Sequence, residues 1–175
     1  MRLPNSESKW WIPMHLTLMT LTLLAVALLI PKADAADENG DAFCLAKNIY
    51  FEAGNQPYAG KVAVSQVVMN RVMSDEYPDD ICGVVYQAKL KENWKGNLMP
   101  VRHMCQFSWY CDGKSDVPED SATWNSSLQI AYSLLYYRND DITEGATHYH
   151  NDTVHPYWAD SLNRTVTIDN HIFYK

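Results

Sequence analysis

Apolar side chains recur at helical spacing near residue 41. Over Asp41–Ala53, Leu45, Ile49 and Ala53 fall on one stripe, and Gly54 follows where a helix would stop. This pattern predicts a helix with one face directed toward a core.

Residues 59–120 predict a second helix, a loop, a short helix and an irregular segment. Residues 59–73 are apolar on most sides, and their length predicts a buried helix, although the valines would also suit a strand. A turn-rich loop at 74–80 and a short helix at 81–88 should follow. Residues 93–120 contain the helix breakers, so we expect them to be irregular.

The last third of the chain predicts one more helix and a hairpin. Ser121 can cap an amphipathic helix, and the segments 165–168 and 171–174 flank the two-residue loop Asp169-Asn170. The apolar stripe of the helix consists of Trp124, Leu128, Ala131 and Leu135. The fold class expected from these elements is mainly α (α+β), with a small C-terminal β-hairpin.

The N-terminal 35 residues look like a secretory signal peptide. A short basic start precedes the uncharged apolar run 16–30, and Ala33-Asp34-Ala35 is an A-x-A cleavage signature. The run is shorter than the ~20 residues of a spanning helix, although residues 10–13 could lengthen it into an uncleaved anchor. We therefore expect a signal peptide at 1–35 and a secreted or periplasmic domain at 36–175.

Composition narrows the function classes. The 175 residues carry 14 basic and 21 acidic side chains, and 47% of them are hydrophobic, which is enough for one domain with a real core. The net charge of -7 argues against nucleic acid and against adhesion to an anionic surface. We expect a monomer with no stable membrane partner once the signal peptide is removed.

Four cysteines, an even number, lie in the part expected to be exported. An oxidising compartment favours disulfides, and three connectivities are open. Cys105 and Cys111 bracket a short loop, so we favour that pair, with Cys44 and Cys82 joining two helices. A zinc site is the alternative, although the sequence has no CxxC motif.

Glu52 is the candidate acid. It lies three residues after Ile49 and seven after Leu45, so it should share their partly buried face. Burial raises the pKa of a carboxyl group, as a general acid near neutral pH requires. The alternative is an ordinary surface glutamate at a helix end.

Two further segments carry candidate chemistry. His148, His150 and His155 could ligate zinc or could simply hydrogen-bond a polar substrate. The segment Gln106–Tyr110 combines amide, hydroxyl and aromatic groups, which suit sugar rings, but Phe107 could equally plug the core together with Trp109. Motifs of serine hydrolases, P-loop NTPases and zincins are missing from the sequence.

Several separated blocks resemble the SleB-type (spore-cortex-lytic) cell-wall hydrolases. They are Cys44-Leu-Ala-Lys-Asn-Ile-Tyr-Phe-Glu52-Ala53, Gly60–Arg71, Ile81–Gln87, Cys105–Gly113, Gly145–His150, Pro156-x-Trp158 and His171–Tyr174. These blocks span nearly the whole of 44–174 in the order of the family, which makes the match far more specific than any single block.

The resemblance implies a lysozyme-like domain that cuts the glycan strand of peptidoglycan. Glu52 takes the place of the family's catalytic acid, and the reaction is that of a lytic transglycosylase or muramidase, without metal or cofactor. The residues expected to bind substrate are Asn70, Gln106, Ser108, Trp109, His148, Tyr149 and His150.

One departure bears on the reaction. The family commonly reads E-A-x-G-E-P, but Gln56 replaces the second acid here, which favours a single-carboxylate transglycosylase route or weak activity. Asp169 also stands where glycine is usual, a mild change because Asp tolerates turns. Two rival functions remain open: a zinc-dependent cell-wall amidase or peptidase, and a non-catalytic wall-binding module.

Overall fold

The computed structural model describes residues 40–137 and 139–175. The expected signal peptide at 1–35 lies outside the described residues and stays a prediction. None of the described helices has the length and apolar character needed to cross a membrane.

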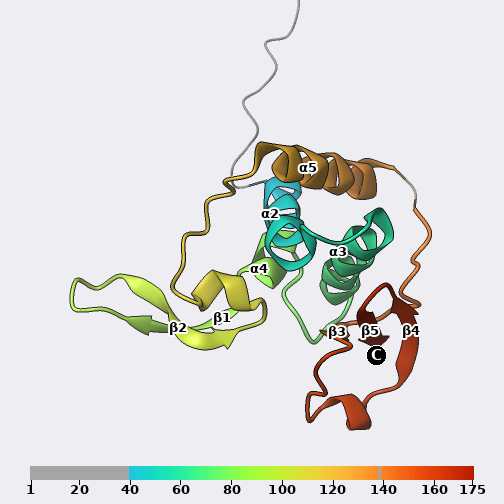
Figure 1. Ribbon diagram of the computed structural model, residues 1–175. Coiled ribbons are helices and arrows are strands. Elements are labelled where there is room, and N and C mark those ends of the chain that lie inside the picture. Colours follow the sequence, from blue (N-terminus) through green and yellow to red (C-terminus); the bar gives the residue numbers. More distant parts are fainter. Residues whose placement is uncertain (1–39, 138) are drawn as a thin grey trace, which may run out of the picture. The chain divides into compact units, whose positions relative to one another are not determined.

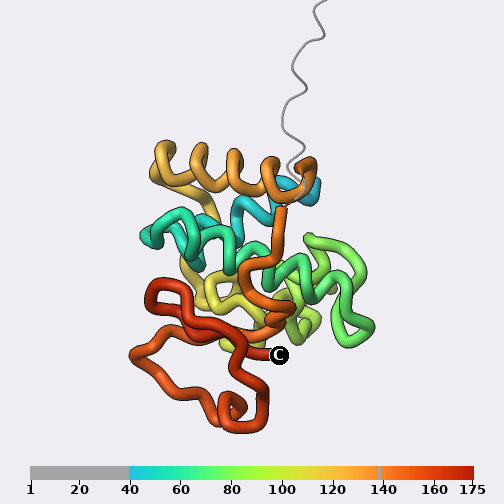
Figure 2. The backbone as a smooth tube through the Cα atoms, turned by 90° about the vertical axis from the view of Figure 1, so that its right-hand side faces the viewer, coloured from blue at the N-terminus to red at the C-terminus, as the bar shows by residue number. Residues whose placement is uncertain are grey.

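Helix α2 (Asp41–Ala53) lies at the centre of the helical part. It contacts α3 (Tyr58–Val72), α4 (Ile81–Val85) and α5 (Ser121–Tyr136). Figures 1 and 2 show α5 lying over α2 and α3, with the C-terminal strands on the opposite side of these helices. The last turn of α2 reaches the C-terminal strands, since Glu52 accepts a hydrogen bond from Tyr149.

The sequence pattern explains why α2 occupies this place. Leu45 and Ile49 are fully buried, as their spacing predicts, and they belong to the main apolar cluster. The helix ends at Ala53, and a Cβ atom at Gly54 would collide with the carbonyl oxygen of Tyr50. Glycine is thus required where the chain leaves α2.

Helix α3 is buried on two sides, which confirms the expectation of a buried helix. Val62 and Val68 pack in the main cluster, whereas Ala63 and Val67 pack in a second cluster with Phe173. Helix α3 thereby joins the helical part to the C-terminal sheet. A helix with two apolar faces shows no single stripe, which is why the sequence pattern was ambiguous.

The C-terminal sheet contains β3 (His148–Asn151), β4 (Arg164–Ile168) and β5 (His171–Tyr174) in the antiparallel order β3-β5-β4. The predicted hairpin is formed by β4 and β5. Asp169 in its turn has a φ of 50°, in the left-handed region that glycine adopts most readily and Asp tolerates.

The expectations for 81–120 were partly wrong. Helix α4 ends at Val85, and the antiparallel strands β1 (Ala88–Glu92) and β2 (Leu98–Cys105) follow where a helix end and irregular chain were expected. Their residues are largely exposed, so the strands lack the alternation that reveals a half-buried strand, and Pro100 inside β2 obscured it further. Two short 3-10 helices, η1 (Ser108–Cys111) and η2 (Ala159–Ser161), complete the described elements.

The cap of α5 also differs from the prediction by one residue. The carboxylate of Asp120, not the hydroxyl of Ser121, accepts a hydrogen bond from the backbone N–H of Thr123 at 2.6 Å. Asp and Ser are both good caps, so spacing alone could not choose between adjacent candidates.

Both favoured disulfides are present. Cys44–Cys82 joins α2 to α4, and Cys105–Cys111 joins the end of β2 to η1. The second bond closes the loop that includes Ser108. Both apolar clusters and both disulfides lie within the described part of 36–175, so this part contains its own core.

Candidate active site

Glu52 lies in the last turn of α2 at the junction of two clefts. The larger cleft has a volume of about 580 Å³ and the smaller one about 280 Å³. The two share Phe51, Glu52 and Ser108, so they meet at this carboxyl group. A long substrate lying across both clefts would pass over Glu52.

The larger cleft runs between the helical part and the C-terminal sheet. Its walls come from the end of α2, from α3, from the chain before η1, and from β3 and β5. The lining residues are Phe51, Glu52, Asn55, Gln56, Arg71, Gln106, Phe107, Ser108, Tyr149, His150, Asn151, Val154, Asn170 and His171.

The environment of Glu52 favours its protonated form. Burial raises the pKa of this carboxyl group and is the largest influence on it. Two neighbours act in the opposite direction: the Tyr149 hydroxyl donates a 3.0 Å hydrogen bond to Oε2, and the positive charge of Arg71 lowers the pKa. Burial also raises the pKa of Tyr149, so its hydroxyl keeps the proton that it donates.

Arg71 is a site residue that sequence reasoning did not single out. Its Nε donates to the carbonyl oxygen of Thr147 at 2.8 Å, and its guanidinium lies 5.3 Å from the ring centre of Phe107. Among the described residues, its buried Nη1 has no hydrogen-bond partner. The available signal was a charged residue on a helix otherwise predicted to be buried.

The loop 106–110 divides its roles between core and cleft. Phe107 and Trp109 are only 3% and 6% exposed, so both rings pack in the core, while Phe107 also lines the larger cleft and Trp109 the smaller one. Trp109 stacks on Phe51 with ring centres 4.9 Å apart, and its indole N–H donates to Asn48 Oδ1 at 3.0 Å. Gln106 and Ser108 are exposed and line the larger cleft.

Side chains alternate between the two faces of β3. The rings of His148 and His150 both lie beside Trp158, at 5.3 and 5.6 Å, while Tyr149 faces the other way and reaches Glu52. His148 lines neither cleft that contains Glu52. The side chain of this strand that contacts the candidate acid is therefore Tyr149.

Asn70 was predicted to bind substrate, but it lies outside both clefts. It is buried, and its amide donates to Asp141, to Thr143 and to the carbonyl oxygen of Ala146. These bonds hold the turn that precedes β3. Its contribution to the site is therefore to fix the approach of the strand that carries Tyr149.

Two carboxylates near Glu52 also escaped the sequence argument. Asp112 and Asp116 line the smaller cleft together with Glu52. Burial raises the pKa of Asp116, and the nearby Lys47 partly opposes this effect. Gln56, which replaces the second acid of the family, lies in the larger cleft. Asp112 and Asp116 nevertheless place two more carboxyl groups near Glu52.

The three histidines considered as zinc ligands are held by other groups. His150 Nε2 lies 3.0 Å from the Tyr174 hydroxyl and its Nδ1 lies 2.9 Å from the carbonyl oxygen of Asn151, whereas exposed His155 pairs with Asp160. Together with His148 they do not bring three ligand atoms to one point within the described part of the chain.

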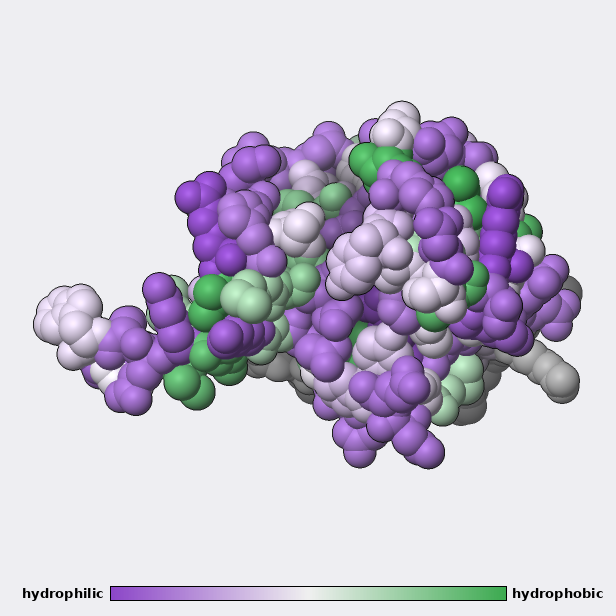
Figure 3. Space-filling view, turned by 90° about the horizontal axis from the view of Figure 1, so that it is seen from below, coloured by the Kyte–Doolittle hydropathy of each residue, from purple (hydrophilic) through white to green (hydrophobic). Residues whose placement is uncertain are grey.

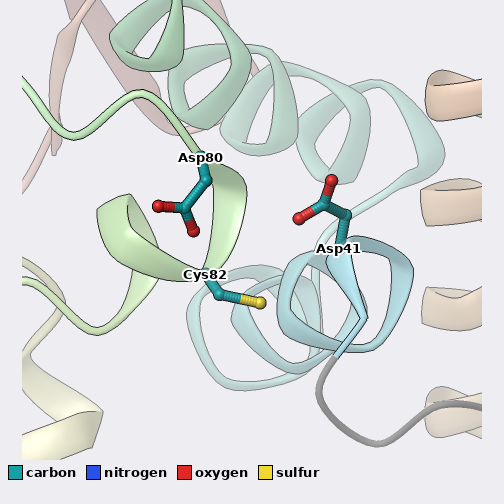
Figure 4. Close-up of side chains that lie close together, drawn as sticks. All are labelled: Asp41, Asp80 and Cys82. Carbon is teal, nitrogen blue, oxygen red and sulfur yellow. The ribbon is translucent and has the colours of Figure 1, made fainter.

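A different group does bring its atoms together. Asp41, Asp80 and Cys82 approach one another between α2 and α4 (Figure 4). The sulfur of Cys82 is bonded to that of Cys44, and Asp80 caps α4 by accepting a hydrogen bond from Gly83 N at 2.6 Å. This group belongs to the framework of the fold.

A third cavity, of about 700 Å³, does not contain Glu52. It is lined by Lys47, Tyr86 and Tyr110, among others, and it shares Asp116 with the smaller cleft. We place the candidate active site at Glu52 because burial, the Tyr149 hydrogen bond and the junction of two clefts coincide there.

The family model described as Cell Wall Hydrolase matches residues 55–174. The chain belongs to the cell wall hydrolase family. The matched range begins just after Glu52, so the place of Glu52 in the site rests on the geometry described above.

Curated relatives agree with this membership. The chain is 28% identical over 140 residues to a spore cortex-lytic enzyme of Halalkalibacterium halodurans, covering 79% of this chain and 36% of that protein. A spore cortex-lytic enzyme of Bacillus subtilis is 39% identical over 49 residues, which is 28% of this chain and 16% of the relative. The chain thus spans about a third or less of the length of these relatives.

Solved structures extend the likeness to the fold. The catalytic domain of the Bacillus cereus SleB protein matches with a TM-score of 0.55 at 25% identity, covering 81% of this chain and 94% of that one. The catalytic domain of the germination-specific lytic transglycosylase SleB from Bacillus anthracis matches with a TM-score of 0.57 at 25% identity, covering 82% and 99%. The expected fold class, a lysozyme-like α+β domain, is confirmed.

Proposed function

We propose that the chain is an exported enzyme that cleaves the MurNAc-GlcNAc glycan strand of peptidoglycan, with Glu52 as the catalytic acid. The observation that supports this most is a largely buried carboxyl group with a raised pKa, located where two clefts meet. Family membership supports the cell wall as the place of action.

The proposed chemistry starts with proton transfer from Glu52 to the glycosidic oxygen. The bond to the leaving sugar breaks as the MurNAc ring gains oxocarbenium character. In the transglycosylase route, the Glu52 carboxylate then takes the proton of the MurNAc C6 hydroxyl, whose oxygen closes a 1,6-anhydro ring. This cycle returns Glu52 to its starting state without a cofactor.

A muramidase route would use water in place of the C6 hydroxyl. It usually needs a second carboxylate, as nucleophile or as base. Asp112 and Asp116 share the smaller cleft with Glu52, so this chain has acids near the site despite Gln56. The two routes give products that differ by one water.

The larger cleft offers polar groups to hold the sugars. Gln106 and Ser108 present an amide and a hydroxyl at its edge. Three lining residues, Arg71, Asn170 and His171, each have a buried polar atom without a hydrogen-bond partner among the described residues. Such atoms are costly to leave unpaired, so they are suited to bind N-acetyl and hydroxyl groups.

The two rival functions make different predictions. A zinc amidase acting on the stem peptide would need ligand atoms that converge, whereas His148, His150 and His155 have separate partners. A wall-binding module without turnover would keep the cleft and bind sacculi without releasing soluble muropeptides. The environment of Glu52 favours the enzyme.

The test is Glu52→Gln, a nearly isosteric change that cannot donate the proton. We expect lysis in a zymogram to fall by about 10²–10⁴-fold. The fold should survive. The pKa of Glu52 is higher in the folded than in the unfolded chain, so ionisation of Glu52 destabilises the folded state once the pH exceeds the unfolded pKa. Glutamine does not ionise, so at pH 7 the variant should have a melting temperature no lower than that of the wild type. Clearing at wild-type strength by the folded variant would rule out Glu52 as the acid.

A further inference from the structure

The β1–β2 hairpin, residues 88–105, is a projecting segment with several exposed apolar side chains. It contacts the rest of the domain mainly through β2 and η1, and it projects to the left in Figures 1 and 3. Its exposed apolar side chains, with exposed fractions, are Trp94 89%, Leu98 65%, Met104 49%, Leu90 47% and Met99 47%. Single exposed apolar residues are ordinary, but a group on one projecting hairpin indicates an interaction surface.

The same hairpin concentrates positive charge. It has four basic residues against Glu92, a net charge of +3, whereas the rest of 36–175 has 7 basic and 18 acidic residues, a net charge of -11. Within the described ranges, no ion pair involves any of the four cations. The four are Lys89, Lys91, Lys95 and Arg102.

The tip of the hairpin is ordered by its own hydrogen bonds. The backbone N–H of Asn93 donates to the carbonyl oxygen of Asn97 at 2.8 Å. The Oδ1 of Asn93 accepts from the backbone N–H groups of Lys95 and Asn97 at 2.9 and 3.0 Å. The ammonium of Lys95 lies 4.7 Å from the ring centre of Trp94. Trp94 is therefore held outward by a preformed turn, with a cation beside it.

We propose that this hairpin docks on the surface of an anionic lipid bilayer. Tryptophan prefers the membrane interface, where its ring meets both apolar and polar groups. Trp94 at the tip and Leu98 beside it can insert among acyl chains, while the lysines reach lipid phosphates. A glycan strand offers no apolar interior for these aliphatic side chains, so a bilayer complements the hairpin better.

This inference revises the expectation drawn from net charge. Charges on different parts of the surface are screened from one another beyond a Debye length of about 10 Å at 0.1 M salt. An approaching membrane therefore meets the local charge of the hairpin more than the net charge of the domain. The inference does not depend on Glu52 or on the reaction that it performs.

The test uses the disulfide-bonded domain 36–175, since residues 16–30 would themselves partition into lipid. Sedimentation with vesicles of phosphatidylcholine containing phosphatidylglycerol is compared with sedimentation with pure phosphatidylcholine. We expect binding to the anionic vesicles that weakens as salt is raised. Lys91→Gln with Lys95→Gln should weaken it on the order of tenfold, as should Trp94→Ala with Leu98→Ser.

The matched control is Tyr157→Ala, which removes another aromatic ring, 94% exposed, outside the hairpin. It should bind vesicles as the wild type does, and all variants should release muropeptides from purified sacculi at the wild-type rate. The proposal is overturned if the wild type does not bind anionic vesicles, or if the hairpin variants bind them equally well. Hairpin variants that lose binding to sacculi while vesicle binding is absent would assign the hairpin to the glycan instead.

Discussion

Two side chains near Glu52 oppose the effect of burial on its pKa. The Tyr149 hydroxyl donates to its carboxylate, and Arg71 adds a positive charge nearby. Both favour the ionised form, whereas burial favours the protonated form. The pKa of Glu52 is therefore raised by burial and is lowered in part by Tyr149 of β3 and Arg71 of α3.

Tyr149→Phe tests this balance. The change removes the hydrogen bond that lowers the pKa of Glu52 but keeps the ring, which packs 5.7 Å from that of Phe173. The pKa of Glu52 should rise, so the decline of kcat/KM at alkaline pH should begin at a higher pH than in the wild type. The pH profile of muropeptide release measures this shift.

Tyr136→Phe is the matched control, because this hydroxyl is on the exposed face of α5 and its loss should leave the profile unchanged. The role assigned to Tyr149 would be contradicted if kcat/KM of Tyr149→Phe declined at the same alkaline pH as that of the wild type, or at a lower pH.

The sequence predicted some residues of the site better than others. Helical spacing predicted only that Glu52 shares the partly buried face of Leu45 and Ile49, and it left an ordinary surface glutamate as the alternative. The resemblance to the SleB-type hydrolases singled Glu52 out as the candidate acid. Its contact with Tyr149 joins residues 97 positions apart, and periodicity cannot show which strand will meet which helix. Arg71 and His171 escaped notice for the same reason, since their place in the cleft arises from tertiary packing.

Among the elements, those with a buried face were predicted and the exposed hairpin was not. Helices α2 and α5 and the β4–β5 turn each carry a local signal. Strands β1 and β2 carry little, because exposure removes the selection for alternating apolar positions, and their register is set by cross-strand pairing such as Leu90 with Pro100.

The two disulfides should stabilise the elements unequally. Cys44–Cys82 closes a separation of 38 residues and Cys105–Cys111 one of 6. In the chain-entropy description the gain grows as 1.5RT times the logarithm of loop length, so replacing the first pair by serine should cost about 1.6 kcal/mol more than replacing the second. Urea unfolding of the two double variants measures the difference.

The second pair should matter more for binding than for stability. Its loss frees the loop that carries Gln106 and Ser108, so affinity for sacculi should fall while the domain stays folded. Equal free energies of unfolding and unchanged binding in both double variants would contradict this division of roles.

In the whole molecule, the cleft is created where two apolar clusters meet. The main cluster positions α2 and Glu52, the second positions the C-terminal sheet, and Tyr149 packs against both. The walls of the cleft therefore come from segments at opposite ends of the domain. The composition of the chain indicated one domain with an apolar core. It could not indicate that the cleft lies between two apolar clusters.

Mass spectrometry of the soluble products from purified sacculi tests the central claim most directly. Cleavage of the glycan strand with Glu52 as acid predicts disaccharide-peptides with 1,6-anhydro-MurNAc ends from the transglycosylase route. Reducing ends, one water heavier, would indicate the muramidase route, and neither product should form with Glu52→Gln. Free stem peptides released from intact glycan strands would contradict the account, since they would show cleavage of the amide bond by other residues.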